Sequence, residues 1–233
     1  MKFSQFKFWS ALSISALLVA CGGGGGGGSS GPIASTETFQ LRTSYVSYIN
    51  GSGSWPFTIS GSTSGVNVTG NGTETAGSVA SATFEGQAAQ AKTTTATGTF
   101  SANGQSYPLA TTTTAYVSSN YDPLGFNGSE YEVVSTSTPI PVTARVNDTG
   151  TWYSSVRYTS SSKATRAGTA TSTFVLEPDT ASTALLKIIR VEKNTSGTVT
   201  STNTSTFRMT PAGALTRLSE TILEGSTTLT LTY

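Results

Sequence analysis

The sequence predicts an all-β fold: an antiparallel meander forming a curved half-barrel, a barrel or a two-sheet sandwich, with one possible short N-terminal helix. Three observations predict it. The 35 serines and 43 threonines make up a third of the 233 residues, while charged residues make up only 11%. Threonine is β-branched and suits the outer face of a pleated strand. Apolar and hydroxyl residues alternate after residue 53, between frequent turn signals.

The first twenty residues are predicted to be a signal peptide. Lys2 and Lys7 form a basic head before the apolar run Phe8 to Ala20. This run is short for a permanent membrane helix, which needs about 20 apolar residues, and it ends at a small residue. The end of this run and the next residue form the tetrad Leu18-Val19-Ala20-Cys21, which resembles the lipobox of bacterial lipoproteins. The resemblance covers only the leader, and no family is recognised for residues 35–233.

The lipobox resemblance implies a lipid anchor on Cys21. In that family the thiol is alkylated with diacylglycerol, the signal peptide is cut before the cysteine, and the new α-amine is acylated with a fatty acid such as palmitate. Three acyl chains anchor a protein almost permanently. Gly22 stands where an aspartate commonly signals inner-membrane retention, so we expect the outer membrane, with the periplasmic or surface face left open.

Residues 21–34 are expected to be the lipidated cysteine and a Gly/Ser-rich tether, followed by a single β-rich domain over 35–233. Such a flexible coil holds the domain roughly 20 Å from the lipid. The membrane, reached through the lipid on Cys21, is therefore the first expected partner.

Composition argues against several kinds of chemistry. The chain has no histidine, and Cys21 is its only cysteine. Ser-His-Asp catalysis, imidazole-bound zinc and disulfides are therefore excluded. Without Lys2 and Lys7 the net charge is −1, and the remaining basic residues are scattered, so no nucleic acid is expected. We expect neither an enzyme nor a cofactor or metal site.

A short helix is predicted first, because apolar residues recur at helical spacing between Leu41 and Ile49. Ser35 or Thr36 could cap it and Gly51 could end it. The repeating residues are Leu41, Tyr45, Tyr48 and Ile49. The competing interpretation is a strand with one face formed by Phe39, Leu41 and Thr43.

Strands follow to the end of the chain. Turns are expected at Ser60-Gly61, Asn71-Gly72, Asn103-Gly104, Asn127-Gly128 and Asp148-Thr149-Gly150. The C-terminal strands are expected near 151–160, 168–177, 184–193, 198–210, 214–223 and 226–233. They are joined by Ser-Ser-Lys, Glu-Pro-Asp, Asn-Thr-Ser-Gly and Pro-Ala-Gly turns. Short connections of this kind join antiparallel neighbours.

Three short patterns suggest catalysis, and each has a simpler interpretation. Asp148-Thr149-Gly150 resembles the aspartic protease triplet, but it occurs once and is more typical of a turn. Ser160-Ser161-Ser162-Lys163 has a Ser-x-x-Lys spacing but is expected at a polar hairpin tip. Glu130 and Glu132 share one strand face and could imitate a glycosidase pair, although a solvated face is the preferred interpretation.

Two further groups could bind a ligand. The oxygen-rich loop of Asn120, Asp122, Asn127 and Glu130 is interpreted as an ordinary turn rather than a cation site. Seven aromatic residues gather in the middle of the chain, either as core or as a platform for a carbohydrate or an apolar ligand. They are Tyr116, Tyr121, Phe126, Tyr131, Trp152, Tyr153 and Tyr158.

The expected function is a lipid-anchored, non-catalytic binding or structural module of the cell envelope. Its ligand is not specified by the sequence: an apolar molecule, a carbohydrate or an envelope protein is possible. A first alternative is a carrier of a lipid or other apolar ligand in a curved sheet. A second is a small outer-membrane barrel, because the ending Leu229-Thr230-Leu231-Thr232-Tyr233 resembles the terminal β-signal of such barrels.

Overall fold

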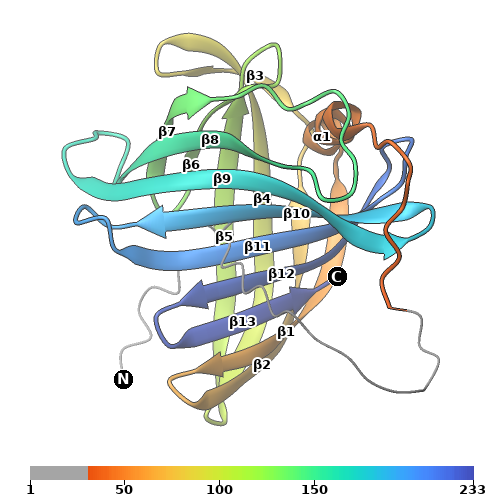
Figure 1. Cartoon of the computed structure of the whole chain (residues 1–233). Coiled ribbons are helices and arrows are strands. Elements are labelled where there is room, and N and C mark those ends of the chain that lie inside the picture. Colours follow the sequence, from red (N-terminus) through yellow and green to blue (C-terminus); the bar gives the residue numbers. More distant parts are fainter. Residues whose placement is uncertain (1–30) are drawn as a thin grey trace.

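A closed antiparallel β-barrel forms the body of the protein in the computed structural model, which describes residues 31–233 (Figure 1). The strand order is β2-β1-β13-β12-β11-β10-β9-β8-β7-β6-β5-β4, and a pairing between β2 and β4 closes the ring. A thirteenth strand, β3, pairs only with β4. The barrel alternative is therefore confirmed over the sandwich. Cys21 and the leader 1–20 lie outside the described residues.

The elements follow one another along the chain in this order: α1 (Leu41–Asn50), β1 (Gly53–Thr63), β2 (Val66–Ala76), β3 (Ala80–Phe84), β4 (Gln87–Ala102), β5 (Gln105–Val117), β6 (Pro123–Asn127), β7 (Tyr131–Ser137), β8 (Thr149–Tyr158), β9 (Arg166–Thr180), β10 (Thr183–Lys193), β11 (Val199–Met209), β12 (Leu215–Glu224) and β13 (Thr227–Thr232). The six predicted C-terminal strands correspond to β8 to β13. Period-two alternation located them because each strand has one buried face.

Several predicted turns are confirmed. Asn103 and Gly104 connect β4 to β5 with φ angles of 52° and 73°, the left-handed conformation that tight hairpin turns require. Asn127 ends β6. The Asn-Thr-Ser-Gly segment ending at Gly197 joins β10 to β11, and the Pro-Ala-Gly segment ending at Gly213 joins β11 to β12.

Three predicted turns are wrong. Ser60-Gly61 lies within β1, Asn71-Gly72 within β2, and Glu177-Pro178-Asp179 within β9. A Cβ atom at Gly72 would lie 2.5 Å from the carbonyl oxygen of Thr97, so this glycine permits close strand approach rather than a turn. The proline-containing segment lies beside a shift in the register of β9 with β10, where proline is tolerated in a sheet.

The predicted helix is confirmed, but its proposed N-terminal caps, Ser35 and Thr36, are not. α1 begins after Gln40, whereas the hydroxyl of Ser35 donates to the carbonyl of Ala181 at 2.8 Å. At the other end, the backbone N–H of Gly51 donates to the carbonyl of Ser47 at 2.8 Å, as predicted for the helix stop. The strand interpretation is wrong for this segment, although Phe39 forms an isolated bridge with Ala144.

Two apolar cores fill parts of the barrel. The first, here called the closure core, lies where the first and last strands meet, and comprises Phe57, Ile59, Val68, Ala96, Phe100, Ala102, Leu109, Ile222, Leu229 and Leu231. The second, here called the helix core, comprises Phe39, Leu41, Ala144, Phe174, Leu176, Ala184, Leu186, Phe207 and Met209. α1 contributes to the helix core and lies at one end of the barrel (Figure 1).

Hydroxyl residues cover much of the outer face. On β4, Thr93, Thr95 and Thr97 alternate with inward residues such as Lys92 and Ala96. The hydroxyl of Thr93 bonds that of Thr114 at 2.9 Å across the neighbouring strand β5. Threonine therefore has the outward role that its abundance predicts. Within residues 31–233, no helix combines the length and hydrophobicity needed to cross a bilayer.

Candidate ligand-binding cavity

A cavity of about 200 Å³ lies inside the barrel, between α1 and the inward faces of the strands. Its walls are mostly apolar and aromatic. α1 supplies the first side of the cavity, including Leu41, Tyr45, Tyr48 and Ile49. The facing strands supply aromatic rings from Phe126, Trp152, Tyr153, Phe174 and Phe207.

Edge-to-face ring contacts hold α1 against the strands. The ring of Tyr45 meets that of Trp152 with centroids 4.5 Å apart, and the ring of Tyr48 meets that of Phe207 at 5.5 Å. Tyr48 still keeps 41% of its surface accessible, and it lines the cavity. Burial raises the pKa of Tyr153 to about 12, so its hydroxyl stays protonated. The aromatic rings of this wall therefore carry no charge at neutral pH.

A buried ion network crosses one side of the cavity. The guanidinium of Arg190 pairs with Glu132 and lies 3.0 Å from an oxygen of Glu192. Arg157 bridges the other oxygen of Glu192 and a carboxylate oxygen of Glu130, each at 2.7 Å. These five residues are here called the interior network. All five side chains are at most 8% exposed, and mutual pairing makes such burial tolerable.

A second network lies towards the closure core. Arg217 pairs with Glu74 and, at 2.6 Å, with Glu220. The amide of Asn203 donates to Glu220 at 2.6 Å, and the hydroxyl of Tyr233 donates to Glu74 at 3.0 Å. Burial raises the pKa of Glu74, while Arg217 opposes the shift.

Lys92 is the remaining buried cation of the cavity wall. It projects inward from β4, is 7% exposed, and donates to the carbonyl oxygen of Tyr48. Its ammonium lies 4.8 Å from the centroid of the Tyr48 ring, within cation–π range. Burial lowers the pKa of Lys92, and Glu74 partly opposes this shift. Among the described residues Lys92 forms no ion pair.

Glu130 and Glu132 line the cavity, but the solvated face predicted for them is wrong. The inside of this barrel is partly polar, so inward residues need not be apolar. Glu132 accepts a hydrogen bond from the hydroxyl of Ser155 at 2.6 Å in addition to its pairing with Arg190. Glu130 is engaged by Arg157. Both carboxylates therefore have structural partners, and a glycosidase pair is not supported.

The two sequence patterns that resemble protease and penicillin-binding motifs are turns. The backbone N–H of Arg145 donates to Asp148 at 2.7 Å, and Asn147 has a φ angle of 77°. The backbone N–H of Asp148 also donates to the carbonyl of Arg145 at 2.9 Å, so residues 145–148 form a β-turn that leads into β8. In the second pattern, Lys163 pairs with Glu85 at a hairpin tip. The hairpin tip at Ser160–Lys163 is confirmed, whereas the turn predicted at Asp148-Thr149-Gly150 lies over 145–148, and Thr149 and Gly150 already belong to β8.

The oxygen-rich loop does not converge on a point. The backbone N–H of Asp122 donates to Ser118, the backbone carbonyl of Asn120 accepts from Arg42, and Glu130 faces Arg157. Across the part of the chain that the structure describes, no group of three or more His, Cys, Asp or Glu side chains could hold a metal ion.

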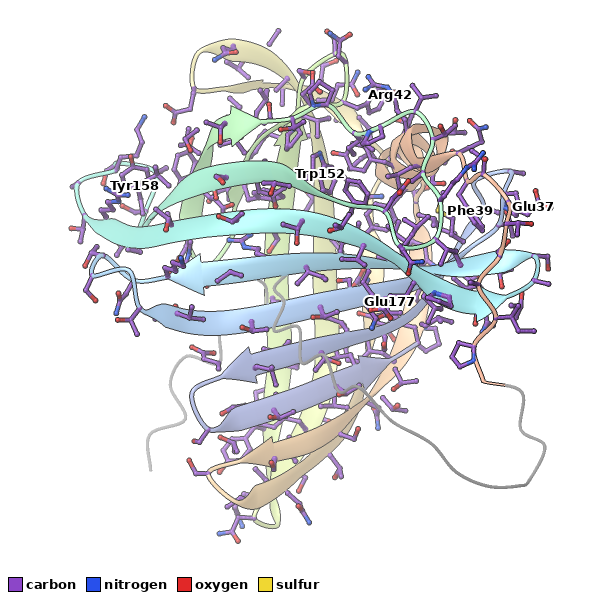
Figure 2. All side chains as sticks on the ribbon, in the orientation of Figure 1. Glu37, Phe39, Arg42, Trp152, Tyr158 and Glu177 are labelled. Carbon is purple, nitrogen blue, oxygen red and sulfur yellow. The ribbon has the colours of Figure 1, made fainter. Side chains whose placement is uncertain are left out.

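The predicted aromatic group divides between two places. Phe126, Trp152 and Tyr153 line the cavity, and Tyr116 borders it while its ring packs on Phe84 outside the barrel. Tyr131 and Tyr158 instead belong to an outer cluster with Phe84, on the outside of the barrel beneath β3. Figure 2 shows Trp152 on the α1 side of the barrel and Tyr158 on the far side. The hydroxyl of Tyr121 accepts from the amide of Asn50 at 2.9 Å.

Sequence reasoning missed the charged part of this site. Lys92 stands in a threonine-rich strand and in phase with Ala96 and Phe100, which was the available signal that it points inward. Arg190 stands in phase with Leu186 and Ile188 on the inward face. No family model matches the chain, and no significant match was found among curated proteins or solved structures.

Proposed function

We propose that this protein is a lipid-anchored binding module of the bacterial cell envelope, and that its barrel holds a small, largely apolar ligand without catalysing a reaction. One observation carries the proposal: an aromatic-walled cavity, built on a closed barrel and covered by a helix. Ligand sites are characteristically concave, mostly apolar, and equipped with a few polar groups.

The size of the cavity supports a small ligand. Protein interiors are close-packed, and an apolar cavity of about 150 Å³ binds a molecule the size of benzene. A space of about 200 Å³ therefore suits a ligand of roughly ten non-hydrogen atoms. This favours one short chain or one ring over a diacyl lipid.

The outer face supports lipid anchoring over a membrane-embedded barrel. Membrane barrels present an apolar band to lipid. Here the outward positions of β11 and β13 carry Thr202, Thr204, Thr206, Thr228 and Thr230. Such a surface suits water, and attachment would then depend on acylation of Cys21.

The anchor is tested by labelling cells that express the full chain with radioactive palmitate. We expect label in the wild type, none in Cys21→Ser, and a mature N-terminus at Cys21. An unlabelled wild-type chain, or label that persists in Cys21→Ser, would remove the anchoring proposal.

The cavity is tested by titrating 1-octanol into the full-length Cys21→Ser protein and following tryptophan fluorescence, since Trp152 lines the cavity. Ala115→Phe places a ring in the cavity and should abolish saturable binding. Ala110→Phe is the matched control, because Ala110 lies exposed on the outer face of the same strand. Equal binding by both variants would place 1-octanol elsewhere and contradict the proposal.

A further inference from the structure

Lys92 differs from the other cations inside the barrel. Arg157, Arg190 and Arg217 each pair with two carboxylates. Lys92 has no such partner among the described residues, although only 7% of its surface is exposed and it lines the cavity. A buried charge without a counterion is costly unless something compensates it.

The protein supplies only part of that compensation. An ammonium group has three hydrogens to donate, and the described contacts engage one of them, with the carbonyl of Tyr48. Glu74, the carboxylate that influences Lys92 electrostatically, is already held by Arg217 and Tyr233. The remaining donor capacity of Lys92 is available to a molecule in the cavity.

The other polar side chains of the cavity wall also favour an anionic ligand. Glu132 accepts from both Ser155 and Arg190, and Glu130 is paired with Arg157, so the wall carboxylates are engaged. The Nε–H of Arg190 is buried and has no acceptor. Buried atoms without a hydrogen-bond partner also occur on Gln90, Thr111, Glu192 and Asn203, but none of these residues lines the cavity. Of the residues that line it, Lys92 and Arg190 have unused donors, which favours an anionic acceptor and disfavours an ammonium ligand.

We propose, resting on the proposed function above, that the ligand is a small monocarboxylate whose carboxylate pairs with Lys92 and whose apolar body packs among the aromatic rings beneath α1. One unpaired cation matches one negative charge, and the limited volume suits a medium-chain or aryl carboxylic acid. A dianion such as a phosphate monoester would leave a charge unpaired in an apolar enclosure.

Lys92 also has a structural contact, which the test must separate from ligand binding. Tyr48 lies in the last turn of α1, where backbone carbonyls carry partial negative charge, so Lys92 also stabilises the end of the helix. Loss of this contact would affect every ligand alike. Loss of an ion pair to the ligand would affect only carboxylates.

The experiment compares octanoate, 1-octanol and octylamine, which share an apolar chain, by calorimetric titration of the full-length Cys21→Ser protein near neutral pH. We expect octanoate to bind roughly tenfold to a hundredfold more tightly than 1-octanol, as a charge-assisted hydrogen bond allows, and octylamine to bind most weakly. Lys92→Met should bring octanoate to the level of 1-octanol, and Lys92→Arg should retain the preference. Lys187→Met, an outward lysine of β10 paired with Glu177, is the control and should change nothing.

The outcomes separate the two proposals. Equal binding of octanoate and 1-octanol by the wild type would overturn the carboxylate proposal and leave the binding cavity intact. A preference that persists in Lys92→Met, or a loss of 1-octanol binding in that variant, would assign Lys92 a structural role and also overturn it. Failure of all three probes to bind would overturn the proposed function itself.

Discussion

Arg190 shows how individual charges are accommodated inside this barrel. Its guanidinium lies between Glu132 and Glu192, with all three side chains at most 5% exposed. We predict that Arg190→Leu lowers the free energy of unfolding by about 3 to 5 kcal/mol, because it leaves buried carboxylates without their counterion. Urea denaturation followed by circular dichroism measures this change.

The control for Arg190→Leu is Lys187→Met on the same strand. Lys187 is paired with Glu177, and both side chains are partly exposed, so its removal should change the free energy of unfolding by less than about 1 kcal/mol. Equal losses from the two substitutions would show that the interior network has no special energetic role.

At the scale of the element, the hairpin formed by β3 and β4 folds against the outside of the barrel. The hydroxyl of Tyr131 donates to Glu85 at 2.6 Å, and Lys163 pairs with the same carboxylate. The ring of Phe84 stacks on that of Tyr116 with centroids 4.5 Å apart. Because β3 pairs with one strand only, these contacts hold its free edge.

The attachment of β3 should depend on pH. The hydrogen bonds from Lys163 and Tyr131 lower the pKa of Glu85. A carboxyl group whose pKa is lower in the folded state stabilises that state above its unfolded pKa of 4.5, and this contribution is lost as pH falls through the lowered value. We predict lower protection factors for the amides of β3 as the pH falls below 4.5, that is, faster exchange relative to the intrinsic rate at the same pH, and the same loss of protection at neutral pH in Glu85→Gln.

Exchange in the other strands should be unchanged in Glu85→Gln, since the closed ring does not depend on β3. Glu37→Gln is the matched control, because Glu37 is exposed in the segment before α1 and distant in sequence from the hairpin. Uniform acceleration across the barrel would contradict a local attachment.

Closure of the barrel requires a glycine at position 98. A Cβ atom there would lie 2.2 Å from the carbonyl oxygen of Asn71 and 2.6 Å from the Cα of Gly72, across the pairing of β2 with β4. We predict that Gly98→Ala destabilises the protein by more than about 3 kcal/mol, because backbone atoms cannot move aside as side chains do.

The control for Gly98→Ala is Gly77→Ala. A Cβ atom at Gly77 would meet only the carbonyl oxygen of Thr93, at an ordinary 3.6 Å. Thermal unfolding should therefore be close to that of the wild type in this control. A tolerated Gly98→Ala would show that β2 and β4 do not approach as closely as described.

Gly72 shows which parts of the fold could be predicted from the sequence and which could not. Alternation and helical spacing predict α1 and the C-terminal strands, because each of these elements buries one face. Asn71-Gly72 was predicted as a turn because the residue pair favours one locally, whereas its glycine is needed for contact with a strand distant in sequence. Tertiary contacts thus override the local signal.

The cavity was predictable only in part, for a related reason. The aromatic residues indicated a core or a platform, and four of the seven line or border the cavity. The side on which Glu132 and Arg190 lie depends on the barrel's polar interior, which reverses the usual assignment of charge to the solvent face. Lys92 and Tyr48 meet only because the helix covers the strand, and no sequence spacing indicates that contact.

At the scale of the whole molecule, the ring that the β2–β4 pairing closes also brings together the first and last strands of the chain, β1 and β13. β1 pairs with β13 in register, with Ser60 opposite Thr230, and Leu229 and Leu231 enter the closure core from β13. Nearly the entire described chain therefore lies between two paired residues. Such long-range closure costs considerable entropy before its contacts compensate for it.

A disulfide between positions 60 and 230 tests that closure. In a Cys21→Ser background, Ser60→Cys with Thr230→Cys should oxidise readily, since directly opposed antiparallel residues lie about 4.5 to 5.5 Å apart, within disulfide range. Linking them closes a loop of about 170 residues, for which chain entropy gives about 5 kcal/mol of stabilisation as an upper value, and about 2 to 4 kcal/mol is expected in practice. Urea denaturation of the oxidised and reduced forms measures the difference.

The control is Ser60→Cys with Thr228→Cys, a pair displaced by two residues in register, which should be stabilised less by oxidation. Equal or greater stabilisation of this displaced pair would show that β1 and β13 pair in a different register.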